Sequence, residues 1–419
     1  MMNKFILMNF KSVFILVFIF VNGISFSYSQ NKEYAAEIIS KLSSKDFFGR
    51  GYVNNGDLKA AMFIADQFER NGATPIGKSY LLPFDISINS FPKPITLEVN
   101  NTKLVPGKDF FVGGGSTATE GDFEVIYLDT TDLKTALKDK KRFDGKIVAL
   151  DAINLKKEET FLLNASGYIF TFKEKIYWRM SDANEVKPFF YFYALDSLIK
   201  NAKTATIDIA NEFYPTYKTS NVVAKINGKK YPDSAFVFTA HYDHLGMMGN
   251  VMFPGANDNA SGTAMLLDMA KHYSKPENQP DYTIIFMAFA AEECGILGAR
   301  HMSENPIIPL SQIKFLINLD MVGTGSEGIG MVNAKVETRA NNLILKINKE
   351  QKLFDNIHSR GARCNSDHCP FAEKSVPSIF IYTRGKEYTH YHTPEDKGPV
   401  PLTKWDELFS LLDIFIKTY

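Results

Sequence analysis

FTAHYDHLGMMGNVMFPGANDNASG, residues 238–262, brings two groups of ionisable side chains close to the end of a predicted strand. The apolar, β-rich run 235–240 precedes His241, so this side chain should leave the carboxyl end of a strand. Open α/β sheets bind their ligands at that edge. Asp258 lies in a turn before the predicted helix 263–273. Histidine and aspartate held in this way are ordinary zinc ligands, so the stretch predicts a metal site in an α/β domain.

A pair of acidic residues follows the next apolar strand. Every residue in the run 284–291 is apolar, and Glu292 and Glu293 come directly after it. An ionised carboxylate loses hydration at the end of a buried strand, so neighbouring acids there need a compensating positive charge. Adjacent side chains point in different directions. One glutamate can therefore bind metal while the other handles protons.

Asp320 ends a further apolar run, 314–319. Taken alone, a strand-end acid is better explained as a helix cap or a surface charge. Three successive strands that end in His241, in Glu292-Glu293 and in Asp320 would however place acids and imidazole along one sheet edge. This recurrence favours a functional site over chance.

The segment EYTHYHTPEDKG, residues 387–398, offers a late imidazole. His392 stands before Thr-Pro, which favours an extended backbone and a fixed loop, and Tyr391 is beside it. His390 is the competing candidate in this segment and is better explained as a structural or supporting residue.

Composition sets the broad class. The chain has 419 residues and is 45% hydrophobic, enough for a large core and for more than one ordinary domain. Its 47 basic residues balance 47 acidic ones, so no electrostatic argument predicts nucleic acid or an anionic membrane as a partner.

The amino terminus has the features of a signal peptide. Lys4 and Lys11 precede the apolar run 13–21, and small residues surround a predicted cleavage site near Ser29. The alternative is an uncleaved anchor, but the run is shorter than the ~20 residues that a bilayer span needs. We therefore expect residues 1–29 to be removed and the protein to be periplasmic or extracellular, without stable membrane insertion afterwards.

The exported chain is predicted to have three parts. Residues 30–87 open the peptidase domain, 88–215 form an inserted, mostly β subdomain, and 216–419 form the catalytic α/β domain. The last part should contain a central mixed, largely parallel sheet flanked by helices, because its strand-like runs are mostly apolar. Those runs are 222–226, 235–239, 283–290, 314–319 and 377–382. The aromatic run 189–193 could line a cleft, but core packing explains it better.

Three cysteines are present. In an exported protein Cys364 and Cys369 could form a small disulfide loop around Asp367 and His368, and Cys294 would remain as a small buried hydrophobe.

Taken together, these motifs resemble the di-zinc aminopeptidases of metallopeptidase family 28, in clan MH. The family pattern is His-x-Asp, an Asp-Asn turn, a Glu-Glu pair, a strand-end Asp and a late Tyr-His. The matching residues here are His241 and Asp243, Asp258, Glu292 and Glu293, Asp320, and Tyr391 with His392. The match covers 222–419, and FDGKIV at 143–148 resembles the protease-associated insert of many members.

The resemblance implies two Zn²⁺ per chain. One zinc would be held by His241 and Asp320 and the other by Glu293 and His392, with Asp258 bridging both. A charge count points the same way, because these three carboxylates and that of Glu292 carry four negative charges, which two Zn²⁺ neutralise.

Further roles follow from the same resemblance. Asp243 would orient His241. Glu292 would be the general base toward a water shared by the metal ions, and Tyr391 would donate a hydrogen bond to the oxyanion. A cis peptide bond is implied between Asp258 and Asn259.

The implied function is hydrolysis of the first peptide bond of peptides with a free amino terminus. A glutaminyl cyclase, typically with one zinc, and a carboxypeptidase of the same clan are the alternatives. A carboxypeptidase needs a basic pocket, and the insert offers only Arg142 and Arg179 as arginines. Asp367 and His368 would shape the substrate pocket or stabilise their loop. His244 would support the site or act as an extra ligand. No oligomeric state is predicted.

Overall fold

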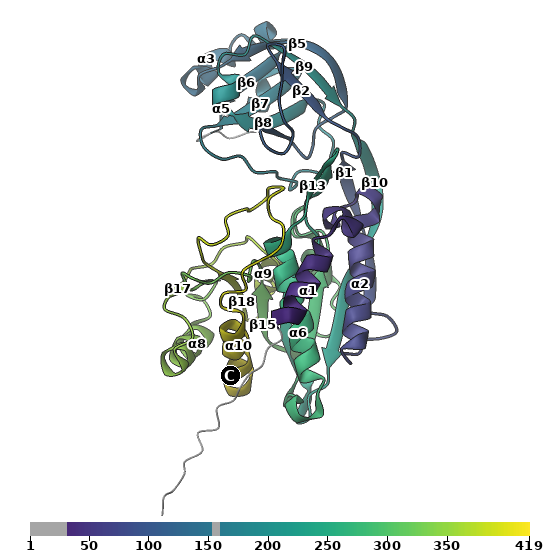
Figure 1. Cartoon of the computed structure of the whole chain (residues 1–419), viewed down its shortest axis with the longest axis vertical. Helices are drawn as coiled ribbons and strands as arrows, with labels where there is room; N and C mark the ends of the chain where they lie inside the picture. The colour runs from purple at the N-terminus through teal and green to yellow at the C-terminus, as the bar shows by residue number, and fades with distance from the viewer. Residues whose placement is uncertain (1–31, 153–159) are drawn as a thin grey trace, which may run out of the picture.

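In the computed structural model, which describes residues 32–152 and 160–419, the strands of these residues form two eight-stranded sheets and a short hairpin. One sheet and its helices make the lower part of the molecule in Figure 1, and the other sheet makes the upper part. The predicted signal peptide, 1–29, lies outside the described residues. None of the helices within the described ranges has the length and apolarity that a membrane span requires.

The first sheet is the mixed, largely parallel sheet predicted for the catalytic domain, and that prediction is confirmed. Its centre is parallel, with β14, β11, β15 and β18 side by side. β1 pairs antiparallel with β10, β10 with β14 and β16 with β18, whereas β16 and β17 pair in parallel. In spatial order the strands are β1 (Leu81–Ser90), β10 (Glu212–Ile226), β14 (Tyr282–Phe289), β11 (Tyr231–His241), β15 (Ile313–Leu319), β18 (Ser378–Thr383), β16 (Ile329–Val332) and β17 (Ile357–Ser359).

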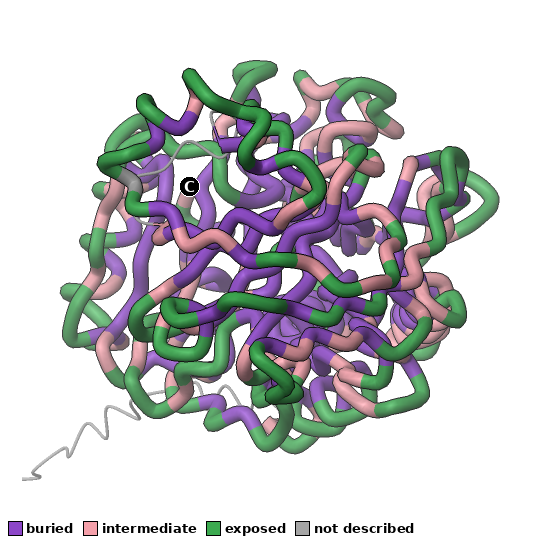
Figure 2. The backbone as a smooth tube through the Cα atoms, turned by 90° about the horizontal axis from the view of Figure 1, so that it is seen from above, coloured by how far each residue is buried: buried purple, intermediate pink, exposed green. Residues whose placement is uncertain are grey.

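Both faces of this sheet are covered. Along β11, Phe236 and Phe238 pack into one apolar cluster, and Val237 packs into a second cluster on the opposite face, because alternate strand residues point to opposite sides. The tube in Figure 2 is correspondingly buried through its centre. The helices of this part are α1 (Lys32–Leu42), α2 (Gly56–Arg70), α6 (Ser261–Tyr273), α7 (Leu297–Glu304), α8 (Thr338–Gln351), α9 (His368–Glu373) and α10 (Trp405–Thr418).

The second sheet is formed within residues 88–215, the range predicted as an insert. Its strands are, in spatial order, β3 (Thr102–Lys103), β2 (Thr96–Val99), β9 (Thr204–Ile209), β5 (Thr119–Tyr127), β6 (Ile147–Asp151), β7 (Gly167–Phe172), β8 (Phe190–Leu195) and β4 (Phe110–Val112). The short helices α3 (Leu133–Ala136) and α5 (Asp196–Ile199) join them. The aromatic residues of β8 are buried in the core, so packing is their role and the suggestion that they line a cleft is wrong.

β1 and β10 connect the two sheets as a long antiparallel ribbon (Figure 1). Their pairing runs from Leu81 opposite Val222 to Ser90 opposite Glu212. The predicted boundaries at residues 88 and 215 thus lie inside paired strands, and the division of the chain into domains stays a prediction.

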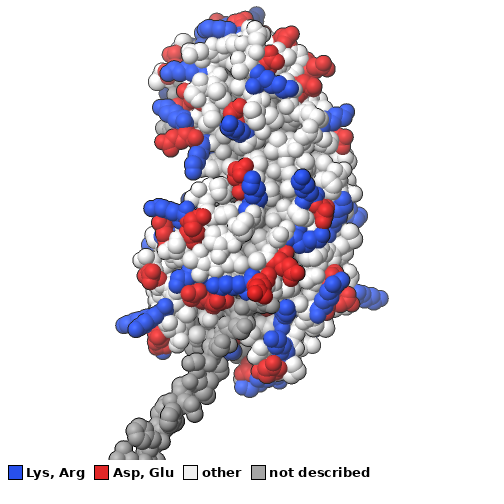
Figure 3. All heavy atoms as spheres, viewed as in Figure 1, with Lys and Arg blue, Asp and Glu red and all other residues white. Residues whose placement is uncertain are grey.

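Charged side chains of both signs are interspersed on the face drawn in Figure 3. This distribution matches the formal net charge of zero.

Candidate metal centre

The site begins at the carboxyl ends of the parallel strands. His241 is the last residue of β11 and pairs with Phe289, the last residue of β14. β15, the other neighbour of β11, ends at Leu319. Because these strands run in parallel, the residues that follow them emerge at one edge of the sheet, as the sequence predicted.

Two histidines approach the two oxygens of Asp258. His241 Nε2 lies 3.4 Å from Asp258 Oδ1 and 3.4 Å from Asp320 Oδ1. His392 Nε2 lies 3.2 Å from Asp258 Oδ2 and 3.2 Å from Glu293 Oε2. All five side chains proposed as ligands from the sequence therefore meet, and Asp258 stands between two groups of donors.

These donor sets fit zinc. Bonds of about 2.0–2.2 Å in a tetrahedral site put neighbouring ligand atoms about 3.3–3.6 Å apart, close to the separations observed here. Asp320 Oδ1 is buried and accepts no hydrogen bond within the described part of the chain. A buried polar atom without a partner is uncommon in proteins, and a bound cation would satisfy it.

His244 lies at the distance from Glu293 and Asp258 that a further metal ligand would have. Its Nδ1 lies 2.8 Å from Glu293 Oε1 and 4.0 Å from Asp258 Oδ2, and its ring is buried. His244, Asp258 and Glu293 together could hold a cation. His244 and His392 are thus competing donors for the metal ion next to Glu293.

Asp243 connects the end of β11 with the glutamate pair. His241 Nδ1 lies 3.1 Å from the main-chain oxygen of Asp243 and 3.7 Å from its carboxylate. The carboxylate accepts the backbone N–H groups of Glu292 and Glu293, at 3.1 and 3.3 Å. Asp243 therefore contacts His241 chiefly through its carbonyl, while its side chain fixes the backbone of the two glutamates.

Arg50 and Asp396 support the turn that carries Asp258. The buried guanidinium of Arg50 donates to the carbonyls of Gly255 and Asp258, at 2.6 and 3.3 Å, and to three further carbonyls. Burial lowers the pKa of Arg50 to about 10, against the opposing effect of nearby carboxylates, and the group stays charged at neutral pH. Asp396 accepts the backbone N–H groups of Asn257 and Asp258. Sequence reasoning assigned neither residue this role.

The inserted subdomain supports His392. Its ring Nδ1 lies 2.8 Å from the main-chain oxygen of Trp178, and the Trp178 N–H donates to the His392 carbonyl at 3.2 Å. The Trp178 indole donates to the Val112 carbonyl at 2.8 Å and packs on Phe253. Because a carbonyl oxygen can only accept a hydrogen bond, Nδ1 of His392 carries the ring proton, and Nε2 is then free to bind a cation. No sequence motif marked Trp178.

Electrostatics set Glu292 apart from its neighbour. Burial, with the negative charges of Asp367, Glu293 and Asp320 and against the favourable charge of His241, raises the pKa of Glu292 well above its usual range. The pKa of Glu293 lies well below its usual range, because His392 and His244 outweigh the effect of burial. A carboxyl with a raised pKa is suited to proton transfer, and one with a lowered pKa is suited to binding a cation.

Several residues of the centre have an uncommon backbone conformation. Ala291, Met321 and His392 have φ angles of 57°, 58° and 54°, in the left-handed region that disfavours side chains. Such residues concentrate at functional sites. The peptide bond between Asp258 and Asn259 is cis, which confirms the expectation drawn from the resemblance.

A cleft of about 460 Å³ opens onto the centre. Tyr391 lines it, is 44% exposed and stacks on the ring of His392 at 3.8 Å. The other lining residues are Tyr177, Arg179, Met180, Ser181, Glu292, Glu293, Gly295, Ile296, Asn365 and His392. Residues 177–181, from the range predicted as an insert, supply one wall, and residues between 292 and 392 supply the other.

Asp367 and His368, the candidates for substrate binding, do not line this cleft. The Asp367 carboxyl is fully buried without a hydrogen-bond partner in the described residues. His368 lines a separate cleft, and burial lowers its pKa to about 4. Cys364 and Cys369 form a disulfide around both residues, and Cys294 is buried and free, as expected.

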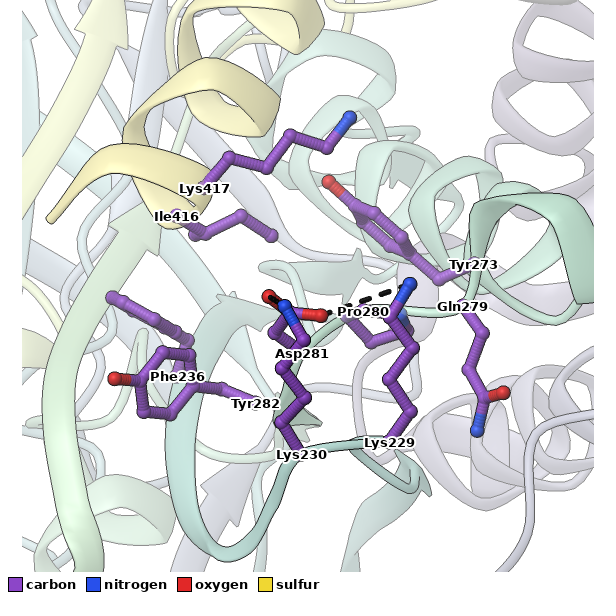
Figure 4. A pocket seen from close by; sticks show the side chains of 10 residues that line it. All are labelled: Lys229, Lys230, Phe236, Tyr273, Gln279, Pro280, Asp281, Tyr282, Ile416 and Lys417. Atoms are coloured by element: carbon purple, nitrogen blue, oxygen red, sulfur yellow. Dashed lines mark hydrogen bonds and ion pairs between the residues drawn. The ribbon is translucent and has the colours of Figure 1, made fainter.

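A pocket of about 280 Å³ lies at the opposite end of the sheet, near the first residues of β11 and β14 (Figure 4). Its one acid, Asp281, pairs with Lys229 and Lys230 at 3.7 and 2.7 Å. This pocket therefore lacks the unneutralised carboxylates that distinguish the metal centre.

Comparison with known proteins agrees with this geometry. Residues 221–412 match the model of peptidase family M28. Aminopeptidase YwaD of Bacillus subtilis (strain 168) is 35% identical over 208 residues, which are 46% of this chain and 42% of the relative, so the chain spans less than half of that relative's length.

Solved structures resemble the whole fold. A peptidase M28 precursor from Shewanella amazonensis SB2B matches with a TM-score of 0.73 and 17% identity, over 92% of this chain and 94% of the other. A zinc aminopeptidase from Bacillus subtilis matches with a TM-score of 0.68 and 23% identity, over 92% and 93%. At these identities the likeness establishes the fold alone.

Proposed function

We propose that this protein is a zinc-dependent aminopeptidase that hydrolyses the first peptide bond of peptides with a free amino terminus. The observation that carries the proposal is the position of Asp258, whose two oxygens face two separate groups of donors 3.2–3.4 Å away. The match of residues 221–412 to the model of peptidase family M28 and the similarity to a protein named as an aminopeptidase support the same reaction class.

The proposed ligands are His241 and Asp320 for one zinc and Glu293 and His392 for the other, with Asp258 between them. Zinc at such a site lowers the pKa of water and polarises a carbonyl group. Glu292 is proposed to take the proton of the attacking water and to pass it to the leaving amine. Burial raises the pKa of Glu292, in keeping with a group that takes up and releases a proton.

Two neighbours are proposed to act on the substrate. Tyr391 lies in the cleft beside His392, where its hydroxyl could donate a hydrogen bond to the developing oxyanion. The acidic cluster attracts a free α-amino group, which would limit cleavage to the amino-terminal bond.

The test is a set of substrates that separates the three reactions of this fold. The protein, loaded with zinc, is assayed on an aminoacyl-nitroanilide, a free peptide, its amino-acetylated form and an amino-terminal glutaminyl peptide. An aminopeptidase releases the first residue of the free peptide and leaves the acetylated form intact. Release of the last residue from the acetylated peptide would establish a carboxypeptidase instead. Cyclisation of the glutaminyl peptide without release of an amino acid would establish a cyclase. Chelator should abolish the reaction and added zinc should restore it.

Export is part of the proposal. It rests on the sequence of residues 1–29 and is in keeping with the disulfide between Cys364 and Cys369, because disulfides persist in oxidising compartments. Detection of the mature protein, cut near Ser29, in a periplasmic or culture fraction tests it.

A further inference from the structure

The wall that the inserted subdomain contributes to the cleft carries a cation. Arg179 is the one lysine or arginine among the residues that line the cleft, and its side chain is exposed. The other ionisable groups of the lining include Glu292 and Glu293, which belong to the metal centre. The cleft thus has an acidic wall and a wall with a single guanidinium.

Arg179 is not engaged in supporting the fold. With the residues of 32–152 and 160–419 it forms no ion pair, hydrogen bond or ring contact, although its charge acts on the buried hydroxyl of Tyr193. By contrast Arg300 pairs with Glu373 at 3.1 Å, and Arg50 is bound by main-chain carbonyls. An exposed arginine in a cleft, without an ion-pair or hydrogen-bond partner among the described residues, remains available for a ligand.

The backbone next to Arg179 is nevertheless fixed against the metal centre. Trp178 exchanges two hydrogen bonds with His392, and Tyr177 packs edge-on against Tyr391 at 5.9 Å. Arg179 follows Trp178 directly, so its Cα keeps a constant position relative to the proposed zinc ligands. The backbone therefore fixes the start of the Arg179 side chain, and the rotatable bonds of the side chain let the guanidinium adjust to a ligand.

Arginine matches the geometry of a carboxylate, because its planar group can donate two parallel hydrogen bonds. The amino end of a substrate is attracted to the acidic wall, which leaves the part beyond the scissile bond to face the rest of the cleft. A volume of about 460 Å³ is in the range of small-molecule sites. Such a cleft suits a short peptide.

We propose that Arg179 is a specificity residue that binds a substrate carboxylate on the leaving-group side of the scissile bond. This inference rests on the proposed aminopeptidase function. The carboxylate belongs either to the carboxyl terminus of a dipeptide or to an acidic second side chain. In both cases the enzyme prefers substrates with a negative charge close to the bond that it cleaves.

The experiment compares kcat/KM for two matched pairs of substrates with the zinc-loaded protein. The first pair is Leu-Leu and Leu-Leu-amide, which tests the terminal carboxylate. The second pair is Leu-Asp-amide and Leu-Asn-amide, which tests the acidic side chain. In one pair or both, we expect the charged substrate to be preferred by about tenfold to a hundredfold, the range of a charged hydrogen bond. The pair that shows the preference identifies the source of the carboxylate.

Arg179→Met should remove the preference, and Arg179→Lys should retain part of it. Lys175→Met is the matched control, because Lys175 is an exposed cation of the same segment that does not line this cleft, and it should leave the preference unchanged. No preference in the natural protein, or the same preference in Arg179→Met, would overturn the inference. Hydrolysis of Leu-nitroanilide by the natural protein tests the proposed function separately. If that fails as well, the aminopeptidase assignment is at fault and not Arg179 alone.

Discussion

At the scale of single residues, the two adjacent glutamates have opposite electrostatic environments. Glu293 faces two histidines, which lower its pKa, whereas burial and nearby acids raise the pKa of Glu292. One change of backbone direction, at Ala291 with φ 57°, separates the end of β14 from this pair. Neighbouring residues of the same type can therefore be a ligand and a proton carrier.

Glu292→Gln tests the proton carrier. The amide keeps the size of the side chain but cannot accept the proton of water, so we expect turnover to fall by about 10²–10⁴. Zinc content, measured by elemental analysis, should remain at two per chain because Glu292 is not a proposed ligand. Asp258→Asn is the comparison, since it removes the bridging carboxylate and should reduce zinc content as well as turnover. A Glu292→Gln protein with full turnover would exclude this residue as the base.

Asp57 gives a prediction for stability that is independent of metal. Its carboxyl is buried in the first turn of α2 and accepts hydrogen bonds from Tyr217 and Thr219, both at 2.7 Å. Burial outweighs these bonds and raises the pKa to about 6 from 3.8. The folded protein therefore holds a proton between about pH 4 and pH 6 that the unfolded chain has released. The contribution of Asp57 to stability is greatest below pH 4 and is lost as the pH rises through 6.

Asp57→Asn should remove this dependence. From pH 4 to pH 7, the unfolding free energy of the natural protein should fall relative to that of the variant by on the order of 2–3 kcal/mol. Urea unfolding at several pH values measures it. A difference that stays constant over this range would show that Asp57 has an ordinary pKa. Asp66→Asn, at a more exposed position of the same helix, is the control and should show little change.

At the scale of elements, the loop between β7 and β8 serves the catalytic domain. The carbonyl oxygen of Trp178 lies at hydrogen-bond distance from His392 Nδ1. The Trp178 indole donates a hydrogen bond to the Val112 carbonyl and packs on Phe253. A proposed ligand of one domain is thus oriented by the backbone of the other.

Trp178→Ala should loosen this support. Loss of the indole removes its packing on Phe253, and we expect the affinity for one of the two zinc ions to fall about 10- to 100-fold, as for other partners of metal-binding histidines. Competition with a chromophoric chelator measures the two affinities. Phe190→Ala, a buried aromatic of the same sheet that does not contact His392, should lower stability without this effect. Equal zinc affinities in both variants and the natural protein would contradict the role of the loop.

The sequence predicted the strands that carry the centre because their apolar runs are long and their polar ends are abrupt. It did not predict α8, whose sequence TRANNLILKINKEQ buries only Ala340, Ile344 and Ile347. β1 was also missed, since Pro83 interrupts its pattern, although an edge strand tolerates proline.

The residues that support the site could not be predicted from local sequence patterns, because their contacts join distant parts of the chain. Trp178 and His392 are separated by 214 residues, and Arg50 and Asp258 by 208. Such contacts depend on how two sheets and a long loop pack together. The ligand types could be inferred from strand ends, whereas these partners use main-chain carbonyls, which every residue possesses.

At the scale of the whole molecule, the two sheets are joined by the ribbon of β1 and β10 and by the hydrogen bonds between the loop at Trp178 and His392. The proposed ligands of the metal centre come from segments spread between His241 and His392. Cations bound there stabilise the folded chain, because the unfolded chain does not bring these residues together.

Zinc-dependent stability therefore reports the number of sites. Above the dissociation constant, each tenfold increase in free zinc adds about 1.4 kcal/mol of unfolding free energy per site. The natural protein should gain about 2.8 kcal/mol per decade, and His392→Ala about half as much, because one site loses a ligand. Unfolding in zinc-buffered solutions measures both slopes. His272→Ala, a histidine of α6 that packs on Phe409 and lies outside the centre, should keep the full slope. If His244→Ala halves the slope and His392→Ala does not, His244 is the ligand beside Glu293, whose Oε1 lies 2.8 Å from His244 Nδ1.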